Sequence, residues 1–96
     1  MGHRRPRPER LGEKLRQIRL AFELSQDLIR TRLGASHIHP GRISEYETGK
    51  RVPPPMILLA YADLAGVHLE DLINDKLDLP KKLPGNVHHG VLPRTS

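Results

Sequence analysis

The sequence predicts an all-α protein of five short helices, with a basic arm before them and a proline-punctuated tail after them. Three observations support this prediction. Apolar residues recur every three or four positions, which is the spacing of an amphipathic helix. Residues that start or stop helices, namely serine, proline and glycine, divide the chain into segments of helical length. No segment of useful length alternates apolar and polar residues, as a half-buried strand would.

The first nine residues, 1–9, are expected to form a flexible basic arm. Arg4, Arg5 and Arg7 lie beside prolines, which prevent a helix from forming. A solubilising tail that contacts nothing is the alternative interpretation.

The first helix is predicted over residues 10–23. Its apolar stripe consists of Leu11, Leu15, Ile18 and Phe22, which are spaced by four, three and four residues. Charged residues are expected to fill the other side of this helix.

The second and third helices follow from their end signals. Ser25 is a strong N-cap residue for the second helix, and Gly34 suits the left-handed residue that ends it. Pro40 suits the first position of a third helix over residues 40–47. Gly49 is expected to terminate that helix.

The last two helices are predicted over 56–65 and around 69–73. Three consecutive prolines precede the fourth helix and permit it to start there, and Gly66 closes it. Residues 77–96 form the proline-punctuated tail, which is expected to lack regular structure. Three leucines of the tail could lie along the core surface: Leu77, Leu79 and Leu83. This divides the chain into an arm (1–9), a helical domain (10–76) and a tail (77–96).

The composition excludes several classes of protein. A chain of 96 residues suffices for one domain with a small core. The absence of cysteine excludes a disulfide scaffold and a thiolate zinc site. No apolar stretch follows the charged N-terminus, so no signal peptide is expected. No apolar run reaches about 18 residues, so no membrane span is expected. We therefore expect a cytoplasmic protein.

The charge is distributed unevenly along the chain. Residues 1–62 hold 12 basic and 6 acidic side chains, whereas residues 63–80 hold 1 basic and 5 acidic side chains. The formal net charge of the whole chain is +5 at pH 7. This asymmetry suggests one face turned towards a polyanion and another turned away from it. A basic protein with no polyanion partner is the alternative.

One set of residues in fixed order runs through the predicted helices. It comprises Ser-Gln at 25–26, Leu-Gly at 33–34, Ile-Ser-Glu-Tyr-Glu-Thr-Gly at 43–49, Pro53 and Leu-Leu-Ala-Tyr-Ala at 58–62. Over about residues 11–74 the sequence thereby resembles the Cro/repressor-type helix-turn-helix domain, also called the Xre family. The resemblance implies a five-helix, lambda-repressor-like fold that binds double-stranded DNA, with residues 40–47 as the recognition helix in the major groove. It implies a sequence-specific, nucleoid-associated transcriptional regulator, such as a repressor.

The exposed residues at the start of the recognition helix are the candidates for contact with DNA bases. Arg42 is the strongest candidate, because a guanidinium can donate to both acceptors of guanine. Glu45 could accept from a cytosine amino group, or it could orient Arg42, which lies three residues away on the same face. An ordinary solvated charge is the alternative for each. The expected base-contact residues are Pro40, Gly41, Arg42 and Glu45.

The resemblance also implies contacts with DNA phosphates. Gln26 matches a family position at the start of the second helix, where free backbone N–H groups favour an anion. Lys50 and Arg51 follow the recognition helix and match basic phosphate-binding positions. A plain helix-opening residue and a solvated loop are the alternatives. The expected phosphate-contact residues are Gln26, His39, Ser44, Lys50 and Arg51, together with Arg4, Arg5 and Arg7 of the arm.

The resemblance assigns Arg19 and Glu47 a structural role, as a partly buried ion pair between the first and third helices. The sequence departs from the family pattern in two places. Eight residues, 35–42, stand where the family usually has five, and Arg30 stands where the family usually has alanine. These departures suggest a wider or re-angled helix-turn-helix.

Catalytic and metal-binding functions are not expected. Four histidines, His37, His39, His88 and His89, lack the helical spacing of metal ligands. No glycine-rich phosphate loop and no nucleophile with a base at familiar spacing is present. We therefore expect no enzyme activity, no metal and no cofactor.

Two kinds of partner besides DNA are considered. The apolar last helix and the tail leucines exceed what one small core needs, so a homodimer is expected to form there. The acidic segment 63–80 would keep that end away from DNA. The alternative function is a protein-interaction module on the same fold, such as an antitoxin or a co-activator-like bridge.

Overall fold

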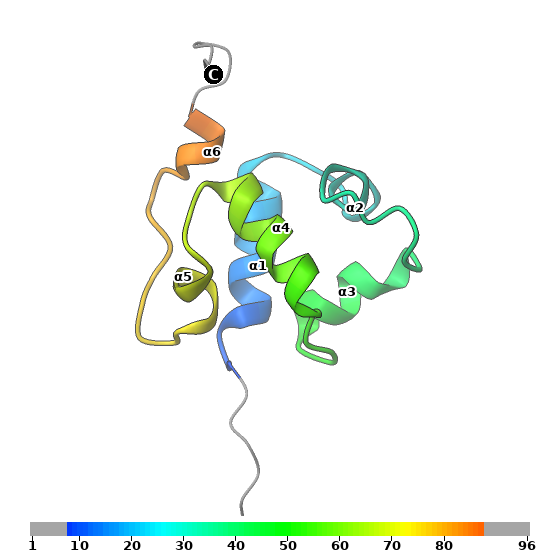
Figure 1. Ribbon diagram of the computed structural model, residues 1–96, viewed down its shortest axis with the longest axis horizontal. Coiled ribbons are helices and arrows are strands. Elements are labelled where there is room, and N and C mark those ends of the chain that lie inside the picture. Colours follow the sequence, from blue (N-terminus) through cyan, green and yellow to red (C-terminus); the bar gives the residue numbers. More distant parts are fainter. Residues whose placement is uncertain (1–7, 88–96) are drawn as a thin grey trace, which may run out of the picture.

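The computed structural model describes residues 8–87, and every regular element in that range is a helix. Helices α1 and α4 lie at the centre, α2 and α3 lie on one side of them, and α5 and α6 lie on the other (Figure 1). The prediction of an all-α domain with five helices is confirmed, and a short sixth helix follows them. The helices are α1 (Leu11–Ala21), α2 (Gln26–Arg32), α3 (Gly41–Thr48), α4 (Pro55–Ala65), α5 (Leu69–Ile73) and α6 (Pro84–Val87).

The helix ends follow the predicted signals closely. The Ser25 hydroxyl accepts a hydrogen bond from the Leu28 N–H at 3.0 Å, which caps α2. Gly34, Gly49 and Gly66 all have positive φ, at 71°, 82° and 75°, and each lies just after a helix.

Several helix boundaries differ from the prediction by one or two residues. Helix α1 ends at Ala21 rather than at residue 23, because Glu23 has a φ of 57° and leaves the helical conformation. Helix α3 begins at Gly41, with Pro40 as its N-cap rather than its first residue.

One hydrophobic core joins the helices. Its fully buried members include Leu15, Ile18 and Tyr61, from the faces of α1 and α4 that meet at the centre. Helix α3 approaches α1 so closely at Gly12 that a Cβ there would lie 2.6 Å from the Glu47 carbonyl oxygen. Glycine at this position therefore allows α3 to sit against α1.

Part of the predicted tail is ordered against the core. The expectation that residues 77–96 lack regular structure is wrong at α6, which packs against the end of α4. Gly85 permits this contact, because its backbone touches the Leu64 carbonyl with no room for a side chain. Leu79 and Leu83 are buried in the core, in agreement with their expected place along its surface. Residues 88–96 lie outside the described range.

These leucines therefore do not provide surplus apolar surface. Leu72 of α5 is fully buried, and Leu79 and Leu83 are only 7% and 5% exposed. Ile73 of α5, however, is 41% exposed, and the homodimer expected at this end stays a prediction.

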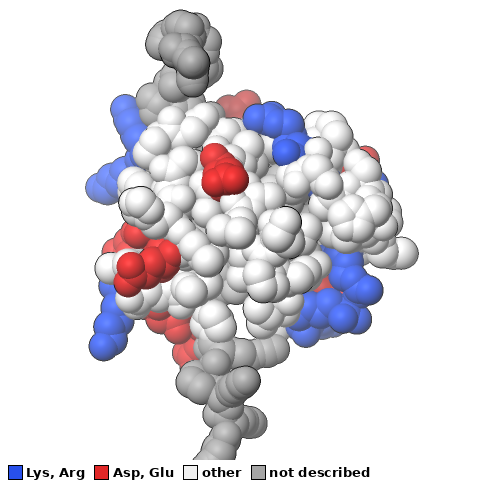
Figure 2. Space-filling view, viewed as in Figure 1, with Lys and Arg blue, Asp and Glu red and all other residues white. Residues whose placement is uncertain are grey.

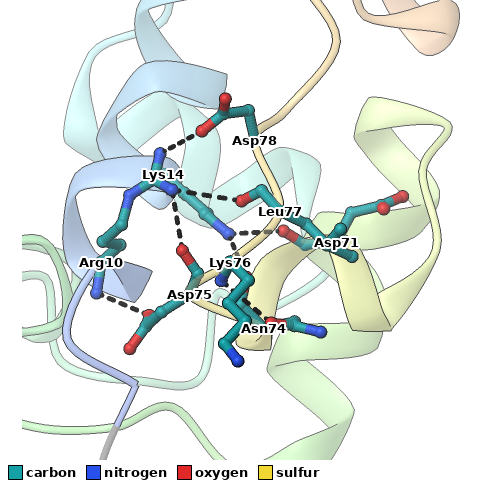
Figure 3. Close-up of polar contacts among 8 residues, drawn as sticks. All are labelled: Arg10, Lys14, Asp71, Asn74, Asp75, Lys76, Leu77 and Asp78. Atoms are coloured by element: carbon teal, nitrogen blue, oxygen red, sulfur yellow. Dashed lines mark hydrogen bonds and ion pairs between the residues drawn. The ribbon is translucent and has the colours of Figure 1, made fainter.

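A polar cluster fastens the start of α1 to the segment that follows α5 (Figure 3). The Asp75 carboxylate accepts hydrogen bonds from the backbone N–H groups of Glu9 and Arg10, both at 2.9 Å. The Arg10 guanidinium in turn donates to the Asp75 carbonyl at 2.9 Å and to the Asp78 carboxylate at 2.7 Å. Asp75 thus satisfies free N–H groups at the start of α1, which has no cap from its own Arg10 side chain.

Lys14 is the buried member of this cluster, although the sequence placed it on the charged side of α1. Its side chain is buried, and Nζ donates to the carbonyls of Asp71 at 2.8 Å and Asn74 at 2.9 Å. Burial, and secondarily the charge of Arg10, lowers the pKa of Lys14. These contacts hold the end of α5 against α1.

Candidate nucleic-acid interface

Helices α2 and α3 are joined by a turn and pack against each other, and α3 also packs along α1. Ile43 and Tyr46 face the core from α3 and are buried. Next to these residues on α3, the side chains of Arg42 and Glu45 are 36% and 38% exposed. Helix α3 therefore has one face fixed in the core and one charged face available to a ligand.

Basic side chains gather around this exposed face. Figure 2 shows Lys and Arg atoms clustered where α3 and the loop after it lie, while the largest acidic cluster in this view lies near α5. The basic residues on and after α3 are Arg42, Lys50 and Arg51, of which the last two are exposed. Lys and Arg atoms also lie beside the acidic cluster in this view, so the basic atoms are not confined to one side (Figure 2).

Glu45 connects the two arginines on this face. Its Oε1 accepts from Arg51 Nε at 2.7 Å and from Arg42 Nη1 at 3.2 Å. The hydrogen bond from Arg51, followed by that from Arg42, lowers the pKa of Glu45. Glu45 thus contacts both Arg42 and Arg51, and its role in orienting Arg42 stays a prediction.

The remaining expected contact residues near α3 lie at its start or on its flank. His39 is exposed, and its Nδ1 accepts from the Gly41 N–H at 2.9 Å, which satisfies a free donor at the start of α3. A neutral imidazole that accepts at Nδ1 carries its proton on Nε2, so the ring has one N–H donor, at Nε2. Pro40 is exposed, whereas Ser44 is half-buried.

Gln26, the first residue of α2, belongs to a hydrogen-bonded group with Arg19 and Glu47. Arg19 donates to both oxygens of Glu47, at 2.7 and 3.0 Å. Gln26 Nε2 donates to Glu47 Oε1 at 3.3 Å. The hydrogen bonds with Glu47 raise the pKa of Arg19. This group ties α1, α2 and α3 together and fixes the amide of Gln26 in a defined place.

The turn between α2 and α3 is fastened by Arg30. Its Nη1 donates to the Ser36 carbonyl at 2.7 Å and to the Ile38 carbonyl at 3.0 Å. Its Nη2 donates to the Asp27 carboxylate at 2.7 Å. The two features that were expected to depart from the family pattern, the longer turn and Arg30, therefore contact each other.

The architecture of a core-anchored α3 beside α2 agrees with a comparison against known families. The model of a family described as "Helix-turn-helix domain" matches residues 10–74. The chain belongs to this helix-turn-helix family. No curated protein and no solved structure matches the chain significantly. Membership of a helix-turn-helix family supports DNA as a partner of this chain.

The match spans α1 to α5. No helix within residues 8–87 is both long and apolar enough to cross a membrane. The same range contains no group of three acidic or histidine side chains placed to hold a metal ion. The arm residues Arg4, Arg5 and Arg7 lie outside the described residues, as do His88 and His89.

Sequence reasoning missed the polar cluster around Lys14 and Asp75 and the contacts of Arg30. The cluster links residues more than 50 positions apart, and no local pattern indicates it. For Arg30 a signal was present, since an inserted turn and an unusual long side chain occurred within a few residues of each other.

Proposed function

We propose that this helix-turn-helix protein is a sequence-specific transcriptional regulator of the Cro/repressor (Xre) type, and that it binds double-stranded DNA with α3 in the major groove. The observation that carries the proposal is the division of α3 into two faces. Ile43 and Tyr46 are buried, while Arg42 and Glu45 point outward from the first two turns. A helix held in this way can present its outward residues to base edges.

Base recognition is assigned to Arg42, with Glu45 as its partner. Arg42 is held by one hydrogen bond to Glu45, so part of its donor set is free to reach the two acceptors of guanine. Glu45 keeps the guanidinium extended, or accepts from a neighbouring cytosine amino group. Pro40 and Gly41, at the start of α3, are the places where backbone can approach the bases.

Phosphate recognition is assigned to residues on both sides of the recognition helix. Lys50 and Arg51 lie in the loop after α3, and His39 precedes it with a ring N–H available to donate. Gln26 lies at the start of α2, where one hydrogen of its amide nitrogen is donated to Glu47 and the other can be donated to a phosphate oxygen. Ser44 completes this set among the described residues. Arg4, Arg5 and Arg7 are proposed to add phosphate or minor-groove contacts.

The remaining parts of the proposal concern the assembly and the setting of the protein. It acts as a homodimer on a near-palindromic site, which is the usual arrangement of dimeric helix-turn-helix proteins. It works in the cytoplasm on the nucleoid, without enzymatic activity and without a cofactor. Sedimentation of the free and DNA-bound chain tests the dimer, and a monomer at high concentration in both states contradicts it.

The decisive experiment is selection of bound sequences from a random duplex pool. We expect enrichment of one motif and a binding constant that falls steeply with salt, as phosphate contacts require. Lys82→Ala is the matched control for Arg42→Ala, because it removes one exposed positive charge near α6, far from α3. Selection without any enriched motif contradicts the proposed function. A stoichiometric complex with another protein that Arg42→Ala leaves unchanged would instead support the interaction module.

A further inference from the structure

We propose that Arg30 is a positioning residue that sets where the recognition helix begins, so that the DNA sequence preference of this protein depends on the hydrogen bonds from Arg30 to the turn. The inference rests on the proposed function, because it concerns how α3 is held for reading bases. Arg30 itself contacts no DNA in this proposal. Its effect on recognition passes through the backbone of residues 36–38.

The Arg30 side chain forms hydrogen bonds with the turn. It is 15% exposed, and Nη1 donates to two backbone carbonyls, those of Ser36 and Ile38. The backbone of Arg30 adds a third link, because its own carbonyl accepts from the Ala35 N–H at 2.9 Å. Asp27, on the preceding turn of α2, accepts from Nη2 and fixes the plane of the guanidinium.

The chemistry of the turn explains why arginine suits this position. Residues 36–38 form no regular structure, so their carbonyl groups require donors from elsewhere. A guanidinium provides five donors in a rigid fork, and one side chain can therefore serve two carbonyls and a carboxylate at once. Lysine has a point charge without this fork, and alanine would leave both carbonyls without these hydrogen bonds.

The fastened carbonyls lie directly before the recognition helix. The Ile38 carbonyl is separated by one residue from Pro40, the N-cap of α3, and Arg42 lies on the first turn that follows. The Ile38 N–H also donates to the Ala35 carbonyl at 3.0 Å, and Ala35 is fully buried. The turn is thus held from the core side by Ala35 and from the α2 side by Arg30.

Removal of the Arg30 hydrogen bonds frees one side of this turn while leaving the core contacts of Ile43 and Tyr46 intact. The first turn of α3 can then shift relative to α2. Base readout requires side chains to be placed within about half an ångström, so such a shift reduces discrimination more than overall affinity.

The test compares full-chain variants at three sites. Arg30→Ala removes the hydrogen bonds, and Arg30→Lys keeps the charge without the fork. Arg32→Ala is the matched control, since it removes the same charge from an exposed position on the same helix. Each variant is first checked by circular dichroism. Asp27→Ala, which removes only the carboxylate partner, provides a milder variant if Arg30→Ala fails to fold.

The first measurement is amide hydrogen exchange of the free protein. In Arg30→Ala we expect faster exchange at the amides of Ile38, Gly41 and Arg42, with unchanged exchange in α1 and α4. Arg30→Lys should lie between the wild type and Arg30→Ala, and Arg32→Ala should match the wild type. Unchanged exchange at the turn in Arg30→Ala overturns the proposal without reference to DNA.

The second measurement is competition binding to the selected duplex and to a scrambled duplex at several salt concentrations. In Arg30→Ala we expect the ratio of the two affinities to fall about tenfold, as it would if one bidentate base contact were absent. The affinity for scrambled duplex and the salt dependence should equal those of Arg32→Ala. Arg30→Lys should recover part of the ratio.

Each alternative outcome has a distinct meaning. An unchanged ratio in a variant with a loosened turn overturns the inference, because the turn then does not control recognition. Equal weakening on both duplexes with a smaller salt dependence overturns it too, because Arg30 would then contact phosphate. If the wild-type protein prefers no DNA sequence, the proposed function is overturned, and with it the dependence of sequence preference on Arg30. The hydrogen-exchange result would still show whether Arg30 holds the turn.

Discussion

Arg19 of α1 and Glu47 of α3 form a bidentate ion pair, in which Arg19 Nε donates to Glu47 Oε2 at 2.7 Å and Arg19 Nη2 donates to Glu47 Oε1 at 3.0 Å. The Glu47 side chain is 3% exposed and the Arg19 side chain is 13% exposed. Arg19 Nη1 also donates to the Leu24 carbonyl at 2.9 Å. The pair therefore joins the first helix, the connector before α2 and the end of α3.

The first prediction is that Glu47→Ala destabilises the fold by about 3–5 kcal/mol at most, because the nearly buried charge of Arg19 loses its partner. Loss of DNA binding should follow loss of helicity across temperature. Thermal melting and duplex binding of the same sample provide the measurement. The double variant Arg19→Met with Glu47→Met is the control, and it should recover much of the lost stability because no charge is left unpaired. A Glu47→Ala protein that melts like the wild type yet does not bind DNA would assign Glu47 a direct role in binding.

The helices themselves could be predicted from sequence, because the signals that start and stop them act locally. Ser25 caps α2 through a hydrogen bond to a residue three positions on, and Gly49 ends α3 through its own backbone conformation. The core faces of α1 and α3 follow from helical spacing, as for Leu15 and Ile43. Such features depend on residues within one or two turns.

The position of Lys14 could not be predicted in this way. A lysine within a charged helix face is usually exposed, and its burial depends on carbonyls of Asp71 and Asn74 that lie 57 and 60 residues further along the chain. Helix α6 was missed for a similar reason, since the proline-punctuated segment before it gives no periodic signal, although the place of Leu79 and Leu83 against the core was expected.

The candidate site was predictable only in part, for the same reason. The burial of Ile43 and Tyr46 agrees with helical spacing, and Arg42 lies beside them with a side chain that is 36% exposed. The hydrogen bond from Arg51 to Glu45 depends on how the loop after α3 folds back, and helical spacing does not describe that loop. The contacts of Arg30 depend on a turn without a repeating pattern.

The second prediction concerns acid. Backbone hydrogen bonds from Arg10 and Glu9 lower the pKa of Asp75 below its ordinary value of 3.8. The folded state therefore favours the ionised carboxylate more than the unfolded chain does. This contribution to stability is complete above pH 3.8 and is lost as the pH falls through the lower pKa of the folded state.

Asp75→Asn tests this prediction. We expect a lower melting temperature than wild type at pH 7, because an amide offers one acceptor and no charge to the two N–H groups. The difference should shrink steadily as the pH is lowered below 3.8, because Asp75 then becomes protonated in the folded state as well. Glu45→Gln is the comparison variant. It also removes a carboxylate whose pKa is lowered, but the hydrogen bonds that lower it come from the side chains of Arg51 and Arg42, at the exposed face of α3. A difference for Asp75→Asn that is constant across pH would mean that its charge plays no part.

The third prediction concerns the basic arm. Removing residues 1–7 should weaken binding to all duplexes alike and reduce the salt dependence by about one unit for each phosphate group that the arm neutralises. The deletion should stop before Glu9, because the N–H groups of Glu9 and Arg10 bind Asp75 and hold the start of α1. Simultaneous replacement of Arg4, Arg5 and Arg7 by glutamine is the control for length and should give the same salt dependence as the deletion. An unchanged salt dependence in both variants would show that the arm does not contact DNA.

The fourth prediction concerns Arg42, which lies on the first turn of α3 and points away from the core. Arg42→Ala should cost about 1–3 kcal/mol on the selected duplex and much less on a scrambled duplex, because a bidentate contact with guanine serves only the correct sequence. Arg42→Lys should recover the affinity for scrambled DNA but only part of the discrimination, since an ammonium lacks the planar fork.

Glu45 allows a second test of this prediction, because its Oε1 accepts from Arg42 Nη1 at 3.2 Å in the free protein. If Glu45 only orients Arg42, Glu45→Gln should reduce discrimination at the same base pair that Arg42→Ala affects, and the double variant should lose little more than Arg42→Ala alone. If Glu45 reads a cytosine itself, the two losses should add and should map to different base pairs. Competition binding of the single and double variants at fixed salt distinguishes these results. Equal weakening of Arg42→Ala on selected and scrambled duplexes would instead make Arg42 a phosphate contact, and would mean that the longer turn before α3 rotates this helix away from the bases.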